Sequence, residues 1–383
     1  MRIAYYNPLL NEPWGAGIHG QALLGSWRSQ GHEVLCLPWA LVEDPAERRS
    51  RQNRYLWLPE AARKAGLDLR ARWHARLRAR DCRDQLGRFR PDVLIARRDR
   101  YDYLLDELLV EAVPLLGEVN AVLSVELAKL TGRRLLPWET KREVRFLRAC
   151  DLLVCVSQVV REDVLNLGVP ESRVLTIPNG VDVDAFSPAA PPDPSLEQWA
   201  KGFSVIFAYC GTFGVTHDME ALAQAANLVG ELVPTAGFLF VGPSAAEAAG
   251  FLPSSLVTSR VRATGRIPHD RVPSALAVAD VFWAAFKHDY GSPLKMFEYL
   301  AMGRPVILAC IGPPADLIRE SKAGSVVGRG DANGLAQLAL EIAEDPSGLA
   351  AVQGRNGRRW AETHASWDSV ARRIVDAARE HLP

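Results

Sequence analysis

Short apolar runs alternate with helical patterns along the whole chain, and this alternation limits the possible fold more than any other feature of the sequence. The helical pattern DMEALAQAANLVGEL (218–232), for example, stands between two such runs. Strand–helix–strand repetition predicts parallel sheets with helices on both faces. The expected strands are RIAYY (2–6), EVLCLP (33–38), DVLIA (92–96), VPLLGEV (113–119), LLVCV (152–156), RVLTI (173–177), FSVIFAY (203–209), AGFLFV (236–241), VRATG (261–265), DVFWA (280–284), PVILA (305–309) and GSVV (324–327).

The alternation is interrupted at SPAAPPDPSLEQWAKG (187–202), where prolines cluster and predict a stiff connector. A chain of 383 residues is also long for one core. We therefore expect two doubly wound, Rossmann-like α/β domains that face a central cleft: 1–186, then the linker 187–202, then 203–365. Ligands of such sheets lie at the carboxyl ends of the strands. A last helix within 366–383 has an apolar stripe and must pack on another surface.

The composition narrows the class of protein. Lys+Arg and Asp+Glu both number 45, so nothing in the overall charge favours nucleic acid as a partner. The six cysteines form no C-x-x-C motif and are expected to be reduced thiols of a cytoplasmic protein. MRIAYYNPLL lacks the apolar region of a signal peptide, and no apolar run approaches the ~20 residues of a membrane span.

One segment, Arg48 to Arg100, is strongly basic, with 16 arginines and one lysine against six acidic residues. Within it, Leu69, Trp73 and Leu77 recur at helical spacing among arginines. One interpretation is a solvated helix whose apolar stripe packs on the core. The other is a basic amphipathic surface that contacts anionic lipid or a phosphorylated acceptor, so that the protein would lie peripherally at the inner face of a membrane.

The string GAGIHG, from Gly15 to Gly20, matches the G-x-G-x-x-G pattern of dinucleotide-binding loops. The match is weak, because residues 7–14 separate it from its strand and the second strand ends without an acidic residue. A glycine-rich loop can still bring backbone N–H groups to an anion at a helix start. His19 is expected either to line the cleft or to be structural.

Two further loops follow strands of the second half. AYCGTFGVTHDMEAL (208–222) predicts a strand, a glycine-bearing loop and a helix capped by Thr216 or Asp218, and its N–H groups could hold an anion. RATGRIPHDRV (262–272) could place a flat base along its backbone. The Asp182–Asp184 D-x-D string lies in a turn without further acids, so no metal site is expected.

The most informative stretch is HDYGSPLKMFEYLAMGRPVI (288–307). Ser292 and Pro293 suit the N-cap and first turn of a helix, and Lys295 adds a positive charge where N–H groups point at a ligand. Glu298, one turn further, could accept two hydroxyl hydrogen bonds from a sugar ring. The alternative is a Lys–Glu pair on a solvated helix, which the apolar residues around both positions argue against.

SPLKMFEYLAMGRPVI, IPNGVDVDAF, CGTFGVTHDMEAL and TGRIP occur in the order found in glycosyltransferase family 4 (group 1), and the chain resembles that family over most of its length, best from about 113 to 310. The resemblance implies the GT-B fold: an acceptor-binding amino-terminal domain, a nucleotide-sugar-binding carboxyl-terminal domain, and a last helix that crosses back to the first domain. It implies a retaining hexosyltransferase that needs neither cofactor nor metal.

The resemblance also assigns roles to particular residues. Lys295, Glu298 and Asn120 would be catalytic, with Glu298 also gripping the nucleotide ribose. His19 and Glu118 would lie on the acceptor side. The donor would be bound by Gly15, Gly17, Gly211, Thr212, His217, Gly265, Arg266, Ile267, Tyr290, Ser292, Pro293 and Leu294.

The chain departs from the family pattern in three places. Tyr290 stands where the first of two glutamates is usual, with Asp289 beside it as a possible substitute. Phe213 and His217 lie near places where many members have Arg and Lys. Asn120 stands where many members have a histidine, although a subset reads EVNA in the same way.

The sequence thus predicts transfer of a sugar from a nucleoside diphosphate, UDP first and GDP second, to a hydroxyl of a glycan, a lipid-linked acceptor or a small molecule. The leaving phosphate would take the acceptor proton. Two alternatives stay open: a sugar-nucleotide epimerase of the same fold, and a non-catalytic nucleotide-sugar- or carbohydrate-binding protein.

Overall fold

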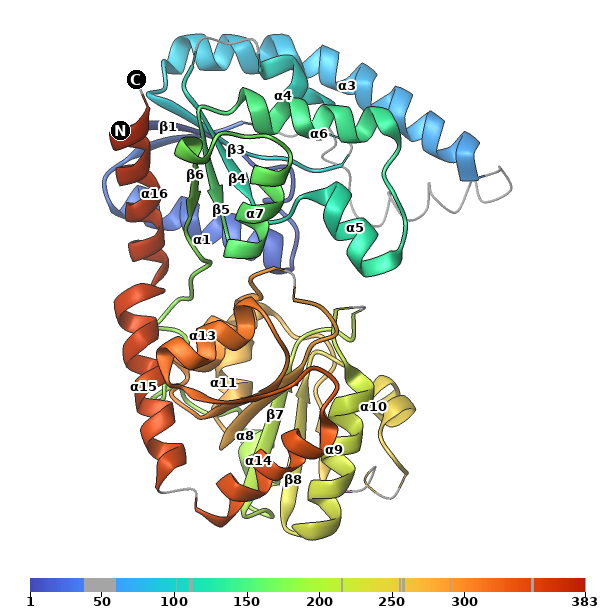
Figure 1. Cartoon of the computed structure of the whole chain (residues 1–383). Coiled ribbons are helices and arrows are strands. Elements are labelled where there is room, and N and C mark those ends of the chain that lie inside the picture. Colours follow the sequence, from blue (N-terminus) through green and yellow to red (C-terminus); the bar gives the residue numbers. More distant parts are fainter. Residues whose placement is uncertain are drawn as a thin grey trace.

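The computed structural model describes residues 1–37, 60–100, 102–109, 113–214, 216–254, 256, 259–289, 291–345 and 348–382. Within these residues, two parallel six-stranded sheets are stacked along the long axis of the molecule, each covered by helices (Figure 1). The strands are β1 (Arg2–Tyr6), β2 (Glu33–Cys36), β3 (Val93–Arg97), β4 (Leu115–Val119), β5 (Leu152–Cys155), β6 (Val174–Thr176), β7 (Val205–Cys210), β8 (Ala236–Val241), β9 (Val261–Ala263), β10 (Val281–Ala285), β11 (Val306–Ala309) and β12 (Gly324–Val327). Each predicted strand is present, and no end shifts by more than two residues.

The helices connect successive strands, as the sequence predicts. They are α1 (Gly15–Ser29), α3 (Glu60–Phe89), α4 (Tyr103–Leu108), α5 (Leu123–Thr131), α6 (Pro137–Ala149), α7 (Gln158–Asn166), α8 (Pro194–Ala200), α9 (Met219–Leu232), α10 (Ala245–Phe251), α11 (Val272–Leu276), α12 (Leu294–Ala301), α13 (Pro313–Ser321), α14 (Ala332–Glu344), α15 (Leu349–His364) and α16 (Trp367–His381), with short 3-10 turns η1 (Glu171–Arg173) and η2 (His269–Arg271).

The strand order shows where each sheet can bind a ligand. The first sheet has the order β2-β1-β3-β4-β5-β6, and the second has β12-β11-β10-β7-β8-β9. In doubly wound sheets a crevice opens where the strand order reverses, beyond the carboxyl ends of the two strands that flank this point. The flanking strands are β1 and β3 in the first sheet and β7 and β10 in the second. The loops after these four strands are therefore the first places to look for a site.

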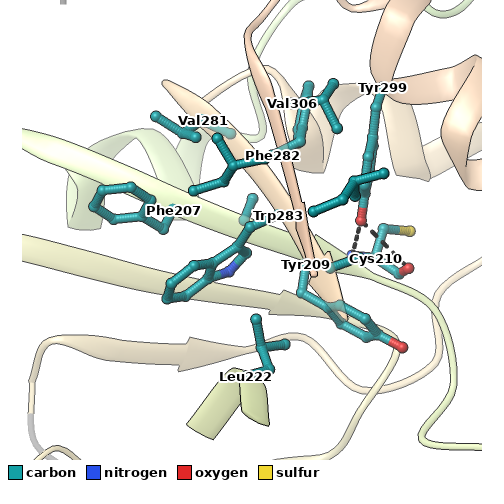
Figure 2. Packing of buried hydrophobic residues seen from close by; sticks show 14 of the residues in the cluster. Phe207, Tyr209, Cys210, Leu222, Val281, Phe282, Trp283, Tyr299 and Val306 are labelled. Atoms are coloured by element: carbon teal, nitrogen blue, oxygen red, sulfur yellow. Dashed lines mark hydrogen bonds between the residues drawn. The ribbon is translucent and has the colours of Figure 1, made fainter. Parts of the chain in front are cut away.

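Aromatic packing holds α12 against the second sheet. The rings of Phe282 on β10 and Tyr299 on α12 stack with centroids 4.4 Å apart, and both side chains are fully buried (Figure 2). The Tyr299 hydroxyl accepts a hydrogen bond of 2.6 Å from the backbone N–H of Cys210, at the end of β7. Tyr299 thus ties the middle of α12 to the strand end beside it, which fixes the side chains one turn earlier on this helix.

The last helix, α16, returns to the first sheet, as predicted. It runs beside α1 at the edge of the molecule, while α15 lies against the second half (Figure 1). Its apolar stripe, which includes Val370 and Ile374, is buried in the same core as Ile3 of β1. The indole N–H of Trp27 donates to the carbonyl of Ala371, 3.2 Å away. The predicted domain limits at 186, 202 and 365 remain predictions, and Phe186 already packs in the core of the second sheet.

Helix α3 faces the core with a different stripe from the one that the sequence suggested. Leu69, Trp73 and Leu77 are 67%, 60% and 57% exposed, so the interpretation that they pack on the core is wrong. The buried face consists of small or apolar residues about half a turn away: Ala71, Ala75, Ala79, Cys82 and Leu86. Small alanines let the helix approach its neighbours closely, so this face is buried and the face with the larger side chains is exposed. Among the described residues, no helix is long and apolar enough to cross a membrane.

Candidate active site

A cavity of about 240 Å³ lies between the two sheets. Its walls come from the first half of α1, the end of β3 and the loops after β4, β5 and β6 in the first half of the chain, and from the segment that leads from β10 into α12 in the second. The lining residues are Gly15, Ala16, His19, Arg97, Asn120, Val156, Asn179, Ser292, Pro293 and Leu294. Six of the predicted site residues, Gly15, His19, Asn120, Ser292, Pro293 and Leu294, are thus brought together.

The start of α12 differs in detail from the prediction. Pro293 is the N-cap, in extended conformation, and no side chain caps the helix. The helix therefore begins one residue later than an N-cap at Ser292 would place it. The ring of Pro293 fixes its φ, so the extended backbone before the helix needs no side-chain cap to hold it. Instead, the carbonyl of Ser292 accepts a hydrogen bond of 2.7 Å from Asn179 Nδ2. No side chain accepts from the N–H groups of the first turn of α12, and of these the N–H of Met296 donates to the carbonyl of Pro293.

Lys295 lies at the crevice of the second sheet, beside the loop after β7. Its Nζ is 2.8 Å from His217 Nε2 and 3.3 Å from the Tyr209 hydroxyl. Burial lowers the pKa of Lys295 to about 8, and burial together with the Lys295 charge lowers the pKa of His217 to about 3. His217 is therefore neutral and accepts from the ammonium group. Within the described part of the chain, no carboxylate forms an ion pair with Lys295.

The position of Gly211 requires glycine for two reasons. Its φ of +136° is a conformation that other residues rarely adopt, and an added Cβ would overlap Lys295 Nζ. Thr212 follows in the same loop, where its carbonyl accepts from the Tyr209 hydroxyl. As predicted, the helix after this loop is capped by Asp218, whose carboxylate accepts the N–H of Ala221.

Glu298 is buried but does not pair with Lys295. Its Oε1 lies 2.8 Å from Nε2 of His269, in the η2 turn after β9. Burial alone would lower the pKa of His269, but the hydrogen bond and charge of Glu298 outweigh it and raise that pKa. The sequence stretch RIPHDRV contained His269, but its partner is 29 residues away, so the pairing had no local signal.

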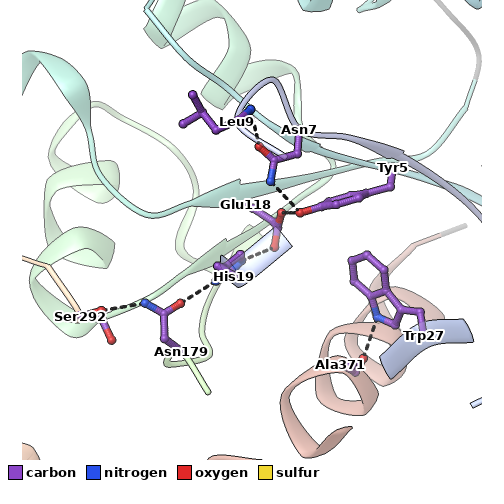
Figure 3. A network of polar contacts seen from close by, with 9 residues as sticks. All are labelled: Tyr5, Asn7, Leu9, His19, Trp27, Glu118, Asn179, Ser292 and Ala371. Atoms are coloured by element: carbon purple, nitrogen blue, oxygen red, sulfur yellow. Dashed lines mark hydrogen bonds and ion pairs between the residues drawn. The ribbon is translucent and has the colours of Figure 1, made fainter. Parts of the chain in front are cut away.

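Across the cavity, a buried hydrogen-bond network joins the first sheet to the start of α12 (Figure 3). The Tyr5 hydroxyl donates to Glu118 Oε2 over 3.1 Å, and His19 Nε2 lies 3.0 Å from Glu118 Oε1. His19 Nδ1 is 2.8 Å from Oδ1 of Asn179, whose Nδ2 donates to Ser292. The path thus runs through four side chains, from β1 to the residue before the N-cap of α12. They are Tyr5, Glu118, His19 and Asn179, of which the sequence predicted Glu118 and His19.

The network orients the Asn179 amide and holds the His19 ring. Asn179 must point its Oδ1 at His19, because its Nδ2 faces a carbonyl that can only accept. The other ring nitrogen faces the Glu118 carboxylate. Burial would raise the pKa of Glu118, but His19, Arg97 and the Tyr5 hydrogen bond together lower it. His19 is thus held by a polar partner at each ring nitrogen, Asn179 Oδ1 at Nδ1 and Glu118 Oε1 at Nε2.

The other predicted residues lie around this centre. Gly17 packs against the backbone of Glu12, where an added Cβ would overlap the carbonyl oxygen. Gly265 has a φ of +68° in the loop after β9, followed by Arg266 and Ile267 and then the turn that holds His269. Asn120 lines the cavity, whereas Tyr290 lies outside the described residues. The Asp182 carboxylate accepts hydrogen bonds from the backbone N–H groups of Asp184 and Ala185, so it stabilises the turn that contains it.

Comparison with known proteins agrees with this arrangement. The family described as Glycosyltransferase Family 4 matches residues 14–185, and the one described as Glycosyl transferases group 1 matches residues 204–345. Over 209 residues the chain is 28% identical to a GDP-mannose-dependent monoacylated alpha-(1-6)-phosphatidylinositol monomannoside mannosyltransferase of Corynebacterium glutamicum, covering 52% of this chain and 54% of that protein. Over 192 residues it is 29% identical to the putative teichuronic acid biosynthesis glycosyltransferase TuaH of Bacillus subtilis, covering 47% of each.

The matches thus span about half the length of these relatives. The solved structure of sucrose-phosphate synthase from Thermosynechococcus elongatus shares the whole fold, with a TM-score of 0.75 over 99% of both chains at 17% identity. The two sheets with their crossing helix and the two family matches lead to one conclusion: the chain belongs to the family 4 (group 1) glycosyltransferases of GT-B fold.

Proposed function

We propose that this chain is a metal-independent glycosyltransferase that moves a sugar from a nucleoside diphosphate sugar to an acceptor hydroxyl with retention of configuration. The observation that supports this most is the Lys295 ammonium. It lies at the crevice of the second sheet with neutral hydrogen-bond partners, and no carboxylate among the described residues pairs with it. A cation held in this way lacks a counterion, which the diphosphate of a donor would supply.

The geometry suggests how each group would act. Lys295 and the N–H groups at the start of α12 would stabilise the charge that grows on the leaving diphosphate. Glu298, oriented by His269, would accept the ribose hydroxyls through its remaining lone pairs. The leaving phosphate oxygen would take the acceptor proton on the same face of the sugar. Asn120 would position a hydroxyl of the acceptor or the donor.

The nucleotide is the first point to test. The sequence placed UDP before GDP, whereas the mannosyltransferase of Corynebacterium glutamicum is described as GDP-mannose-dependent. We propose a thermal-shift panel with UDP-glucose, UDP-N-acetylglucosamine, GDP-mannose and ADP-glucose at several concentrations. A donor that binds the folded chain raises its free energy of unfolding by RT ln(1 + [L]/Kd), so the apparent melting temperature rises with the donor concentration. A panel without any shift would contradict the proposal.

Glu298→Gln tests the site itself. It keeps the size of the side chain but converts an acceptor carboxylate into an amide, and we expect transfer from the identified donor to fall at least about 100-fold. Glu380→Gln, an exposed change on α16, is the matched control and should transfer as wild type. Transfer by Glu298→Gln at the wild-type rate would contradict the assignment. A chelator should leave the wild-type rate unchanged, and conversion of the donor alone into an epimeric nucleotide sugar would indicate an epimerase instead.

We also propose that α3 contacts an anionic membrane surface. Its exposed stripe, Leu69, Trp73 and Leu77, is flanked by the exposed arginines Arg76, Arg78 and Arg80, which is the composition of an interfacial helix. Figure 1 shows this helix at the end of the molecule away from the second sheet, with its amino-terminal part extending past the neighbouring helices. The exposed stripe of α3 therefore lies away from the second sheet.

Vesicle sedimentation tests the contact. Leu69→Ser should weaken binding to vesicles that contain phosphatidylglycerol, because it removes apolar area from the stripe. Leu349→Ser is a matched control, since Leu349 is also 67% exposed but lies at the start of α15 in the second half. Equal binding by both variants and the wild type would contradict the proposal, as would equal binding to neutral vesicles.

A further inference from the structure

Arg97 is a cavity residue that neither the motifs nor the proposed mechanism uses. It is the last residue of β3, and its backbone pairs in register with Glu118 on β4. Because β3 flanks the point where the strand order of the first sheet reverses, Arg97 lies at the crevice of that sheet. Its side chain lines the cavity together with Asn120. Arg97 thus occupies in the first sheet the kind of place that Lys295 occupies in the second.

Two buried donors on this wall lack acceptors. Among the described residues, neither Nη1 of Arg97 nor Nδ2 of Asn120 has a hydrogen-bond partner, although both atoms are buried. Buried donors are rarely left unpaired in native structures, because they have lost water without a replacement. One of the two belongs to a guanidinium group, which is always charged. The pair therefore indicates a missing acceptor that carries negative charge.

The neighbouring carboxylates do not supply this acceptor. Glu118 already accepts from Tyr5 with one oxygen and from His19 with the other. Burial raises the pKa of Glu126, against the lowering effect of the nearby Arg97 charge, and the structure shows no hydrogen bond or ion pair between the two. The Arg97 charge also lowers the pKa of Glu118, but among the described residues no carboxylate forms an ion pair with Arg97, and its buried Nη1 has no acceptor.

We propose that Arg97 and Asn120 form an acceptor-side subsite for an anionic group, a phosphate or a carboxylate. This inference rests on the proposed function, in which Lys295, at the crevice of the second sheet, receives the donor diphosphate. A planar guanidinium with a free N–H and an adjacent amide N–H fits two oxygens of one anion. Pockets for small-molecule ligands reach ~300–1,000 Å³, so a cavity of about 240 Å³ is small for a whole nucleotide sugar but suits the reacting end of an acceptor.

The test uses the full chain saturated with UDP or GDP, whichever binds, so that Lys295 is occupied. Inorganic phosphate, acetate and neutral glycerol are then titrated by calorimetry. We expect phosphate or acetate, but not glycerol, to bind the wild type. Arg97→Gln should weaken that binding at least tenfold while its nucleotide affinity stays within twofold of wild type. Arg359→Gln, an exposed control on α15, should behave as wild type.

The outcomes separate this subsite from the proposed function. Absence of nucleotide binding by the wild type would refute the proposed function, whereas nucleotide binding without any anion binding would overturn only the subsite. A parallel loss of nucleotide affinity in Arg97→Gln would also overturn it, since Arg97 would then serve the donor. Should Arg97→Gln not fold, Asn120→Ala repeats the measurement, because the Asn120 amide N–H has no partner to lose.

The anion could come from a lipid headgroup or from a soluble ester. One arm of the experiment therefore uses glycerol 3-phosphate, and another uses vesicles that contain phosphatidylglycerol with the helix α3 variant Leu69→Ser as background. Binding that is sensitive to Arg97→Gln in either arm supports the subsite and identifies its source. Insensitive binding in both arms overturns it.

Discussion

Affinity for a nucleoside diphosphate should decrease as the pH rises through 8, because Lys295 then loses its charge. Burial lowers the pKa of Lys295 to about 8 in the unliganded protein. The ammonium form is thus present below pH 8 and lost above it. We assume that a diphosphate binds the charged form, since the neutral amine offers no counterion.

The size of the effect follows from the pKa. With a pKa of about 8, roughly 90% of Lys295 is charged at pH 7 and roughly 10% at pH 9. The apparent Kd should therefore rise about tenfold over this interval, equivalent to ~1.4 kcal/mol. Phosphate groups complete their ionisation near pH 6, so the ligand keeps its charge on the diphosphate throughout.

Other groups around Lys295 do not titrate in this interval. Burial and the Lys295 charge hold the pKa of His217 at about 3, whereas burial raises the pKa of Cys210 to about 12 and that of Tyr209 well above its usual value. His269 is different, because its pKa is raised from 6.5 by Glu298. Its loss of charge could add a slope of its own, so the experiment needs a control that retains His269.

Lys295→Arg provides this control, because arginine stays protonated over the whole interval. We would measure UDP or GDP binding by calorimetry from pH 7 to pH 9 for the wild type and Lys295→Arg. The wild type should weaken about tenfold, and the variant should change little, whatever its absolute affinity. Equal slopes for both proteins would refute the reasoning, since the titrating group would then lie elsewhere.

Three substitutions extend the test to the supporting structure. Gly211→Ala should lower nucleotide affinity at least about tenfold by calorimetry, because its Cβ would overlap Lys295 Nζ, whereas Gly214→Ala meets nothing closer than 3.9 Å and should bind normally. Ile374→Ala should lower the free energy of unfolding by about 2–5 kcal/mol in a urea titration, since this side chain is only 2% exposed; a loss under about 0.5 kcal/mol would show that α16 is not docked. Asn179→Ala removes both hydrogen bonds of its amide. It should raise the KM for the donor under conditions in which the variant, by its melting temperature, is still folded; unchanged kinetics would contradict a positioning role.

The sequence was sufficient where the signal is local and periodic. The twelve strands and the returning helix were predicted because buried parallel strands and an apolar helical stripe are readable within a few residues. Helix α3 shows the limit of this reasoning. Trp73 and Ala71 lie on nearly opposite faces, and both faces have helical spacing. Only the neighbours of the helix decide that the small alanines pack inward, and a single sequence does not contain those neighbours.

Long-range pairs mark the second limit. His19 and Asn179 are 160 residues apart, and His269, in the η2 turn, is 29 residues from Glu298 on α12. The sequence identified Glu298 as a carboxylate in apolar surroundings but gave no means of finding its partner. Arg97 was missed because one arginine among many in a basic segment has no distinguishing pattern. Its place at the end of β3, a flanking strand of the crevice, becomes visible only with the strand order.

The distribution of charge near the two crevices suggests what kind of ligands they bind. The formal net charge of the chain is zero, yet the cleft contains cations that its own carboxylates do not neutralise. Glu118 already contacts His19, whereas Lys295 and Arg97, each near the crevice of its own sheet, have no carboxylate in an ion pair with them among the described residues. A buried uncompensated charge destabilises the empty protein and is stabilised by an anion that enters. Two such cations, one at the crevice of each sheet, therefore suit a reaction in which two ligands meet and each brings its own negative charge.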